Sequence, residues 1–173
     1  MRRIWYSVAM SLDGYIAGPN GEYDWIIMDP AIDFEAIMAR FDTLLMGRMT
    51  YELMETQGEA GAMPGKEIYV VSTTLDANAH PAVTLISDDV THAVRALKSL
   101  SGSDIWLFGG GVLFRTLLDA ELVDVVEVAV IPTLIGQGIP LLPGADRNVS
   151  LALEDSTNYP SGTVILRYAV VTA

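Results

Sequence analysis

The stretch that most constrains the fold is an apolar strand that runs directly into three glycines and then into a helix. Ile105 to Phe108 forms the strand, Gly109 to Gly111 follow, and an apolar-periodic segment, Val112 to Leu118, begins at once. Backbone N–H groups at a helix start lack internal partners and carry partial positive charge. Glycines let a phosphate approach them closely. Without the full G-x-G-x-x-G spacing, the stretch indicates either a phosphate-binding turn or a plain strand-to-helix connection.

Apolar strands alternate with helical segments along the chain. Strands are expected over residues 4–10, 43–46, 68–71, 83–86, 105–108, 123–131 and 164–171. Helices are expected over 33–41, 49–55, 90–100 and 112–118, and a loop over 56–65. Such alternation is typical of a mostly parallel sheet with helices on both faces. The sequence therefore predicts one three-layer α/β domain over residues 1–173, with the last two long strands antiparallel at an edge.

Composition narrows the classes of partner. The net charge is −12, which disfavours nucleic acid because phosphate contacts need clustered Lys and Arg. No apolar run approaches the roughly 20 residues of a membrane span, so no membrane association is expected. The chain has no cysteine, and neither histidine has a metal partner at ligand spacing, so no metal is expected. No targeting segment is recognisable, and cytoplasm is the default location.

A second candidate site lies where the expected strand ending at Met46 meets a helix. Gly47 permits close backbone approach, Arg48 supplies a fixed positive charge, and Thr50 supplies a hydroxyl at the helix start. Together these groups suit a phosphate. The alternative is a turn glycine, a solvated arginine and a threonine that merely caps the helix.

Polar residues also end two other strands. Ser72, Thr73 and Thr74 follow a buried strand, where hydroxyls and free N–H groups suit the 2′-phosphate of an NADP-type ribose, or form only a capped turn. Asp13 follows the first strand and either lines a pocket or makes an Asx-turn. A single dinucleotide crossing the strand ends would use the segments after Met46, Val71 and Phe108 together.

These motifs, taken in order, resemble the dihydrofolate-reductase-like superfamily. They are Ala9-Met10-Ser11-Leu12-Asp13-Gly14-Tyr15-Ile16-Ala17; Met46-Gly47-Arg48 with Thr50-Tyr51; Val71-Ser72-Thr73-Thr74; Gly109-Gly110-Gly111; and Pro132 with Ile135-Gly136 and Gly138. Within the superfamily, the chain is most similar to the reductase domain of the bacterial bifunctional riboflavin-biosynthesis deaminase–reductase and its stand-alone relatives. The similarity covers nearly the whole chain and is more specific for fold and NADPH than for substrate.

The resemblance implies a role for each cofactor-binding position. Ala9 and Ile16 would border the nicotinamide; Gly47, Arg48 and Thr50 would meet phosphates; Ser72 and Thr73 would lie by the 2′-phosphate; Gly109, Gly110, Gly111 and Val112 would wrap the pyrophosphate. The resemblance also implies a cis Gly109–Gly110 bond. The implied activity is NADPH-dependent reduction of an aminopyrimidine ribose phosphate, 5-amino-6-(5-phosphoribosylamino)uracil. The alternatives are reduction of another small substrate such as dihydrofolate, or dinucleotide binding without turnover.

The substrate side is less defined. Dihydrofolate reductase has a carboxylate at the start of its first helix, a few residues after a tryptophan, but no acid follows Trp25 at quite that spacing. Asp33 would serve only from a shifted helix, and a helix N-cap is the preferred interpretation. Asp13 and Asp33 are the weak catalytic candidates, and Asp13 and Trp25 are candidates for contacting substrate.

The expected partner is a small molecule, and a homodimer is compatible with the sequence. A phosphate on the substrate would have to be reached by a basic residue. The candidates are Arg2, Arg3, Arg40 and Lys66.

Overall fold

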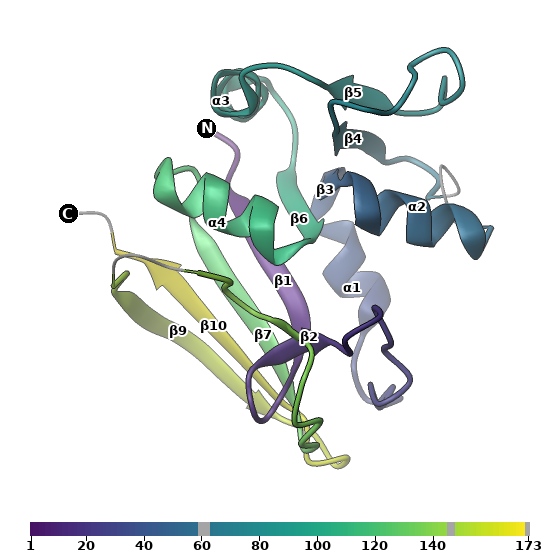
Figure 1. Ribbon diagram of the computed structural model, residues 1–173. Helices are drawn as coiled ribbons and strands as arrows, with labels where there is room; N and C mark the ends of the chain where they lie inside the picture. Colours follow the sequence, from purple (N-terminus) through teal and green to yellow (C-terminus); the bar gives the residue numbers. More distant parts are fainter. Residues whose placement is uncertain (59–62, 145–147, 172–173) are drawn as a thin grey trace.

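The computed structural model describes residues 1–58, 63–144 and 148–171 and is an α/β domain built on one large sheet (Figure 1). Its strands are β1 (Ile4–Ser11), β2 (Tyr15–Ala17), β3 (Phe41–Gly47), β4 (Glu67–Val71), β5 (Thr84–Ile86), β6 (Asp104–Gly109), β7 (Val125–Ile131), β8 (Ile139–Pro140), β9 (Leu151–Asn158) and β10 (Val164–Val170). Its helices are α1 (Phe34–Ala39), α2 (Arg48–Thr56), α3 (Val90–Ser99) and α4 (Gly111–Asp119). None of the described helices is long and apolar enough to cross a membrane.

The large sheet has eight strands in the order β5-β4-β3-β6-β1-β7-β10-β9. The first six are parallel, and β10 is antiparallel to both β7 and β9. This confirms a mostly parallel sheet with an antiparallel C-terminal edge. Because β4, β3, β6 and β1 are neighbours and parallel, their carboxyl ends meet at one edge of the sheet.

Helices cover both faces of the sheet, which makes three layers. Residues of α3 and α4, such as Val94 and Phe114, pack with Leu45 and Leu107 on one face. Tyr51 and Met54 of α2 pack with Leu44, Met46 and Val70 on the other face. Alternate residues of the same strands therefore supply both cores, as a strand period of two requires. This explains why the inner strands are apolar along their whole length.

Helix α1 is shorter than the sequence pattern predicts. It ends at Ala39, and Phe41 begins β3 instead of extending the apolar face of the helix. The reason is aromatic packing, because the Phe41 ring lies 5.9 Å from that of Trp5 and 5.4 Å from that of Trp106. Phe34, the first residue of α1, is 43% exposed.

Three strands were not expected. The edge of the sheet is β9, which lies outside the pair formed by β7 and β10. Its sequence, Leu-Ala-Leu-Glu-Asp-Ser-Thr-Asn, has no sustained apolar alternation, and seven of its eight residues are exposed. β2 and β8 form a small separate sheet of two short strands. The centre of the loop expected over 56–65, residues 59–62, lies outside the described residues.

Candidate functional site

The predicted cofactor segments lie side by side at the carboxyl edge of the sheet. Strand pairing places Met46 opposite Gly109 and Gly47 opposite Val71. The segments that follow β4, β3 and β6 are therefore adjacent in space, although they are separated by dozens of residues in sequence. A ligand lying across this edge would meet all three.

Two helices start at this edge without a side-chain cap. Gly47 precedes α2 and Gly110 precedes α4, and neither helix start receives a side-chain hydrogen bond. By contrast, Asp33 caps α1 and Asp89 caps α3 through their carboxylates. Uncapped helix starts leave N–H donors and the positive end of the helix dipole available to an anion.

The two uncapped starts are close together. A Cβ built on Gly109 would lie 3.4 Å from the Thr50 hydroxyl oxygen, and one on Gly110 would lie 3.8 Å from it. Thr50 is in the first turn of α2, so the hydroxyl expected near the phosphates does lie beside the glycine run. Gly111 is packed differently, because a Cβ there would come within 2.8 Å of a Pro143 side-chain carbon.

The glycine turn is made without a cis bond, so the cis Gly109–Gly110 expectation is wrong for this structure. No described peptide bond is cis. Gly109 has φ +156° and Gly110 has φ +91°. A positive φ, which glycine adopts at little cost, reverses the chain direction into α4 and leaves the peptide bonds trans.

The remaining cofactor candidates are spread over the same region. Arg48 is exposed and makes an ion pair with Glu52 at 2.8 Å on its own helix. The Ser72 hydroxyl oxygen is buried and accepts from the backbone N–H groups of Thr74 and Leu75, both at 3.1 Å, as in the capped-turn alternative. Thr73 is exposed, and Val112 is 72% exposed on the first turn of α4. Their roles in binding stay predictions.

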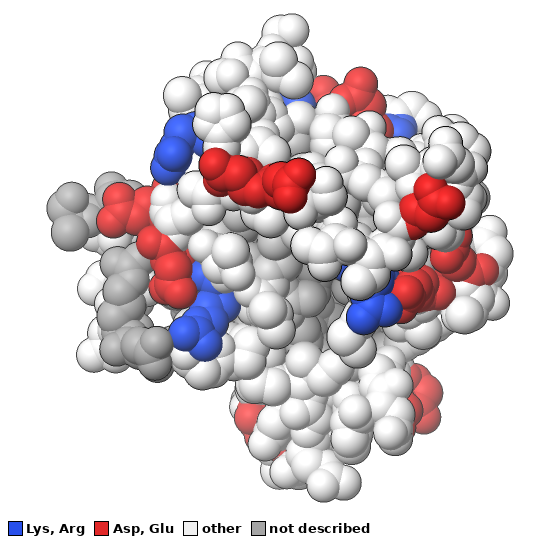
Figure 2. Space-filling model, turned by 45° about the horizontal axis from the view of Figure 1, so that its top comes forward, with Lys and Arg blue, Asp and Glu red and all other residues white. Residues whose placement is uncertain are grey.

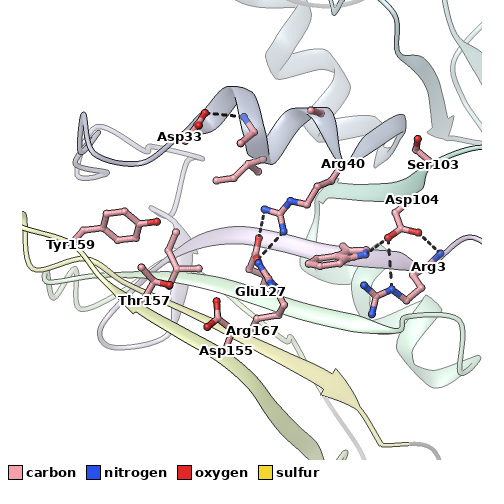
Figure 3. Close-up of a pocket in the computed structure, with 15 residues that line it drawn as sticks. Arg3, Asp33, Arg40, Ser103, Asp104, Glu127, Asp155, Thr157, Tyr159 and Arg167 are labelled. Atoms are coloured by element: carbon pink, nitrogen blue, oxygen red, sulfur yellow. Dashed lines mark hydrogen bonds and ion pairs between the residues drawn. The ribbon is translucent and has the colours of Figure 1, made fainter.

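Two neighbouring hollows lie on the sheet face that carries α1. An apolar slot of about 130 Å³ is lined by residues of β1, β6, β7, β10 and the α1 region, including Ala9, Ile37, Trp106, Ala129 and Ile165. A larger polar cavity of about 820 Å³ is lined by Arg3, Arg40, Asp155 and Arg167 among others (Figure 3). Ile37, Glu127 and Ile165 line both hollows, so the two share a wall.

Glu127 is a buried acid at this shared wall that the sequence analysis missed. It is 3% exposed on β7, and its carboxylate accepts from the Ser7 hydroxyl at 2.9 Å and from Arg167 at 2.9 Å. Arg40 of α1 lies 3.4 Å away (Figure 3). The signal available in the sequence was a charged residue in the middle of each of two apolar runs: Glu127 in 123–131, which also contains Asp124 near its start, and Arg167 in 164–171.

Of the three residues expected on the substrate side, Asp33 lines the polar cavity, whereas Asp13 and Trp25 line neither hollow. Asp33 accepts a hydrogen bond from the Ala36 N–H at 2.9 Å, which confirms it as the N-cap of α1, and it also lines the polar cavity. Trp25 is half-buried, and its indole N–H donates to the Glu22 carbonyl at 3.1 Å. Residues 26–28, directly after Trp25, line the apolar slot. Ile16 is half-buried on β2.

Asp13 holds a turn. Its carboxylate accepts from the Ser11 hydroxyl at 2.6 Å and from the backbone N–H groups of Ile135 at 3.2 Å and Gly136 at 2.7 Å. The Ser11 hydroxyl and these two N–H groups lower the pKa of Asp13 below its usual range. The contacts join the loop after β1 to the loop after β7, so the carboxylate has a structural use that needs no ligand.

This use predicts an acid-dependent loss of stability. A carboxylate with a lowered pKa stabilises the fold above its ordinary pKa, and that contribution disappears as pH falls through the folded value. We expect Asp13→Asn to reduce the dependence of the melting temperature on pH below about pH 4, where an unperturbed Asp titrates. Thermal melts between neutral pH and pH 3 measure this, with Asp119→Asn as a surface control. Parallel curves for Asp13→Asn and the parent would contradict the structural role.

Among the described residues, no group of three or more His, Cys, Asp or Glu side chains is placed to hold a metal ion.

The order of the strands and the layers of helices define a domain with a dihydrofolate-reductase-like fold. A solved dihydrofolate reductase from Enterococcus faecalis, in complex with NADP(H) and RAB-propyl, has the same fold: the alignment covers 98% of this chain and 97% of the enzyme, with a TM-score of 0.68 and 20% identity. The chain belongs to the RibD C-terminal domain family, whose model matches residues 2–165. This match confirms the resemblance found in the sequence and supports the assignment of the protein to the oxidoreductases.

Two relatives match this chain over nearly its whole length. The uncharacterized protein YyaP of Bacillus subtilis is 34% identical over 178 residues, which cover 96% of this chain and 94% of YyaP. A solved structure from Shewanella sp. PV-4, of a protein assigned to riboflavin biosynthesis, is 26% identical with a TM-score of 0.84. That alignment covers 99% of this chain and 100% of the Shewanella chain.

Proposed function

We propose that this protein is an NADPH-dependent reductase of a small planar substrate, of the kind that reduces the aminopyrimidine ribose phosphate of riboflavin biosynthesis. The observation that carries the proposal is the pair of uncapped helix starts, at Gly47 and Gly110, in a domain whose sheet also lines an apolar slot. The helix starts suit the phosphates of a dinucleotide, and the slot suits a flat ring.

The residues at the sheet edge fit a dinucleotide. A Cβ on Gly109 or Gly110 would be in van der Waals contact with Thr50, at 3.4 Å or more, and within 4 Å of no other residue apart from its chain neighbours. A phosphate beside these glycines would meet backbone donors, the Thr50 hydroxyl and, after a side-chain rotation, the Arg48 guanidinium. NADP(H) bound to the similarly folded Enterococcus enzyme supports the choice of cofactor. When bound, NADPH supplies a hydride.

The chain's own residues would position the substrate for that hydride. Ala9 ends the part of β1 that lines the slot, and a small side chain there leaves room for a nicotinamide beside the substrate ring. Ile37 and Trp106 supply apolar walls that exclude water from the ring. The carboxylate nearest to the slot is Glu127, which comes from β7 and not from α1.

The position of the acid weighs against folate as the substrate. The Asp33 carboxylate caps α1 by accepting a hydrogen bond from the Ala36 N–H, and Asp33 is not among the residues that line the slot. Reduction of another small C=N or C=O compound, and dinucleotide binding without turnover, remain as alternative functions. An NADPH-oxidation assay over a panel of aminopyrimidine, pterin and carbonyl substrates separates all three.

Cofactor choice gives a direct test. A site for NAD favours an acidic residue after the strand to bind the ribose hydroxyls. No Asp or Glu lies between Ile68 and Leu75, where Ser72, Thr73 and Thr74 follow β4. We expect NADPH to bind at least tenfold more tightly than NADH, or about 1.4 kcal/mol. Equal dissociation constants in isothermal titration calorimetry would contradict the predicted 2′-phosphate site.

Arg48 gives a second test. We expect Arg48→Ala to weaken NADPH binding about tenfold, because a charge-assisted contact to a phosphate typically contributes about 1.5–3 kcal/mol and this side chain is half-exposed. The fold should be kept, since an exposed i,i+4 ion pair such as Arg48–Glu52 contributes only about 0.5 kcal/mol.

Glu52→Gln is the matched variant for Arg48. It breaks the same ion pair but leaves the guanidinium in place and free to reach a phosphate, so NADPH affinity should be kept or improved. If Arg48→Ala binds NADPH as tightly as the parent does, the prediction is wrong and Arg48 is a solvated surface residue without a part in cofactor binding.

A further inference from the structure

The loop between β4 and β5 carries the residues proposed for the cofactor 2′-phosphate at one end and a histidine near the other. Ser72, Thr73 and Thr74 open the loop, and His80 comes directly before Pro81. The residue before a proline has few backbone conformations, so His80 is a stiff point of the loop. The attachment of the loop at His80 therefore affects how firmly its other end is held.

His80 attaches this loop to α2. Its Nδ1 lies 3.0 Å from a carboxylate oxygen of Glu55 and 3.2 Å from the hydroxyl oxygen of Tyr51. The imidazole ring also packs in a T-shaped arrangement with the Tyr51 ring, with centroids 5.4 Å apart. Tyr51 and Glu55 are about one turn apart on α2. Within the part of the chain that the structure describes, no other hydrogen bond or ion pair joins the loop to this helix.

Both proposed phosphate segments of this region are connected to the same helix. The uncapped start of α2 follows Gly47, and the pairing of β3 with β4 places Gly47 opposite Val71, the last residue of β4. Leu75 packs against the apolar cluster that contains Tyr51. The segment that follows Val71 is therefore fixed to α2 at two points, through Leu75 and through His80.

The contact with Glu55 defines which nitrogen of the His80 imidazole carries a proton. A carboxylate oxygen only accepts hydrogen bonds, so Nδ1, which faces it, is the protonated nitrogen of the neutral ring. A second proton, on Nε2, turns this hydrogen bond into an ion pair. Tyr51 stays protonated, because burial, and then Glu55, raises its pKa. The one carboxylate of the loop, Asp76, accepts from the Asn78 N–H instead.

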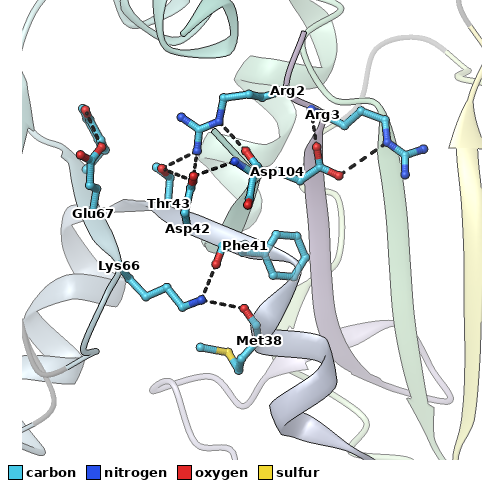
Figure 4. A network of polar contacts seen from close by, with 11 residues as sticks. Arg2, Arg3, Met38, Phe41, Asp42, Thr43, Lys66, Glu67 and Asp104 are labelled. Carbon is cyan, nitrogen blue, oxygen red and sulfur yellow. Dashed lines mark hydrogen bonds and ion pairs between the residues drawn. The ribbon is translucent and has the colours of Figure 1, made fainter. Parts of the chain in front are cut away.

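Positive charge for an anionic cofactor is scarce in this protein. The chain has ten Lys and Arg against 22 Asp and Glu, and acidic side chains are spread over the face shown in Figure 2. Some basic side chains are used within the fold, since Arg2 donates to Asp42 and Thr43, and Lys66 donates to carbonyl groups of α1 and β3 (Figure 4). A positive charge gained by His80 therefore matters to the binding of a phosphate.

We infer that His80 is a positioning residue for NADPH, which holds the loop of Ser72 to Thr74 on α2 and holds it more firmly when the imidazole is protonated. This inference rests on the proposed function, because it takes that loop as the site of the 2′-phosphate. A loop that is fixed in advance loses less freedom when the phosphate binds. The ion pair with Glu55 is present at low pH and is lost as pH rises through the range in which histidine changes charge.

Isothermal titration calorimetry of the full chain with NADPH and with NADH, at about pH 6 and about pH 8, tests the inference. NADH has no 2′-phosphate, so the ratio of the two dissociation constants reports on that end of the cofactor. We expect the preference for NADPH to rise about three- to fivefold more between pH 8 and pH 6 in the parent than in His80→Gln, as a partly exposed ion pair allows. The 2′-phosphate itself takes up a proton near about pH 6, but it does so for parent and variant alike.

Three further variants distinguish positioning from a merely structural role. His80→Gln keeps an N–H donor for Glu55 and should bind NADPH like the parent at pH 8, whereas His80→Ala frees the loop and should bind NADPH more weakly at both pH values, with a smaller effect on NADH. Glu55→Gln should remove the pH effect as His80→Gln does. His92→Gln is the matched control, because His92 is exposed on α3, and it should keep the pH dependence of the parent.

Thermal melts at both pH values show whether each variant is folded. A preference for NADPH that changes with pH in His80→Gln as it does in the parent would overturn the inference. An NADPH affinity in folded His80→Ala equal to that of the parent would overturn it as well.

The outcome also separates the two proposals. A preference for NADPH that is independent of His80 would remove this inference alone. Equal affinity for NADPH and NADH at both pH values would remove the 2′-phosphate site, and this inference with it, but leave a dinucleotide-dependent reductase. No binding of either dinucleotide would remove the proposed function itself.

Discussion

Replacing Gly110 with alanine is expected to abolish NADPH binding. Gly110 has φ +91° immediately before α4, a backbone conformation that L residues rarely adopt. A Cβ there would meet only the Thr50 hydroxyl, at 3.8 Å, so it would project into the space between the two uncapped helix starts. The new methyl group would occupy the proposed place of the pyrophosphate, and the strained backbone would cost about 1–3 kcal/mol of stability.

Gly162 is the matched control for Gly110. It has φ +88° in the turn between β9 and β10, and a Cβ there would lie 3.4 Å from a Pro132 side-chain carbon. Gly162→Ala should therefore lose a similar amount of stability but keep NADPH affinity in the folded protein. Fluorescence titration with NADPH and thermal melts of both variants are the measurements. If Gly110→Ala binds and melts like the parent, the glycine run is only a connection between β6 and α4.

Replacing Glu127 with alanine is expected to lower the free energy of unfolding by about 2–3 kcal/mol. Glu127 is 3% exposed and its carboxylate is shared by Arg40 and Arg167, so its loss leaves two neighbouring guanidinium groups beside Trp5 without their common partner. Breaking a fully buried ion pair costs about 3–5 kcal/mol, and the partial exposure of both arginines reduces that figure. Urea unfolding of the parent and the variant measures the difference.

A second substitution identifies the cause of this loss. If repulsion between the arginines is responsible, Arg167→Met should cost less in the Glu127→Ala background than in the parent, and the two changes should be non-additive by about 1 kcal/mol or more. Glu127→Gln, which keeps an acceptor for the Ser7 hydroxyl, should fall between the parent and Glu127→Ala. A Glu127→Ala protein as stable as the parent would show that the cluster contributes no stability.

Local sequence patterns predicted which residues lie at the ends of the parallel strands. Buried parallel strands appear in the sequence as continuous apolar runs. The residues at the end of such a strand directly follow the run, so they can be identified from the sequence. Gly47, Thr50 and Gly109 to Gly111 could therefore be assigned to strand ends, and parallel pairing brings those ends to one edge of the sheet. The N-cap at Asp33 could also be predicted from the sequence, because capping depends on a hydrogen bond to a residue only three positions along the chain.

The cluster of charged residues around Glu127 depended on contacts between distant segments. Glu127 and Arg167 are 40 residues apart and become direct neighbours only through the antiparallel register of β7 and β10. Arg40 reaches the same carboxylate from α1, 87 residues away. The edge strand β9 was missed because an exposed strand need not alternate apolar and polar residues.

The sequence by itself therefore determined the three-layer class, the order of most elements and the residues at the parallel strand ends, since these follow from side-chain periodicity and local turn chemistry. Only the tertiary structure decided which charged residues meet. A single Glu or Arg in an apolar strand specifies the face on which it lies but not the strand beside it, because pairing and register arise from the packing of the whole sheet. For the same reason, the sequence left four basic residues as candidates for a substrate phosphate, and only the folded chain shows Arg2 and Lys66 bound to acceptors of the protein itself.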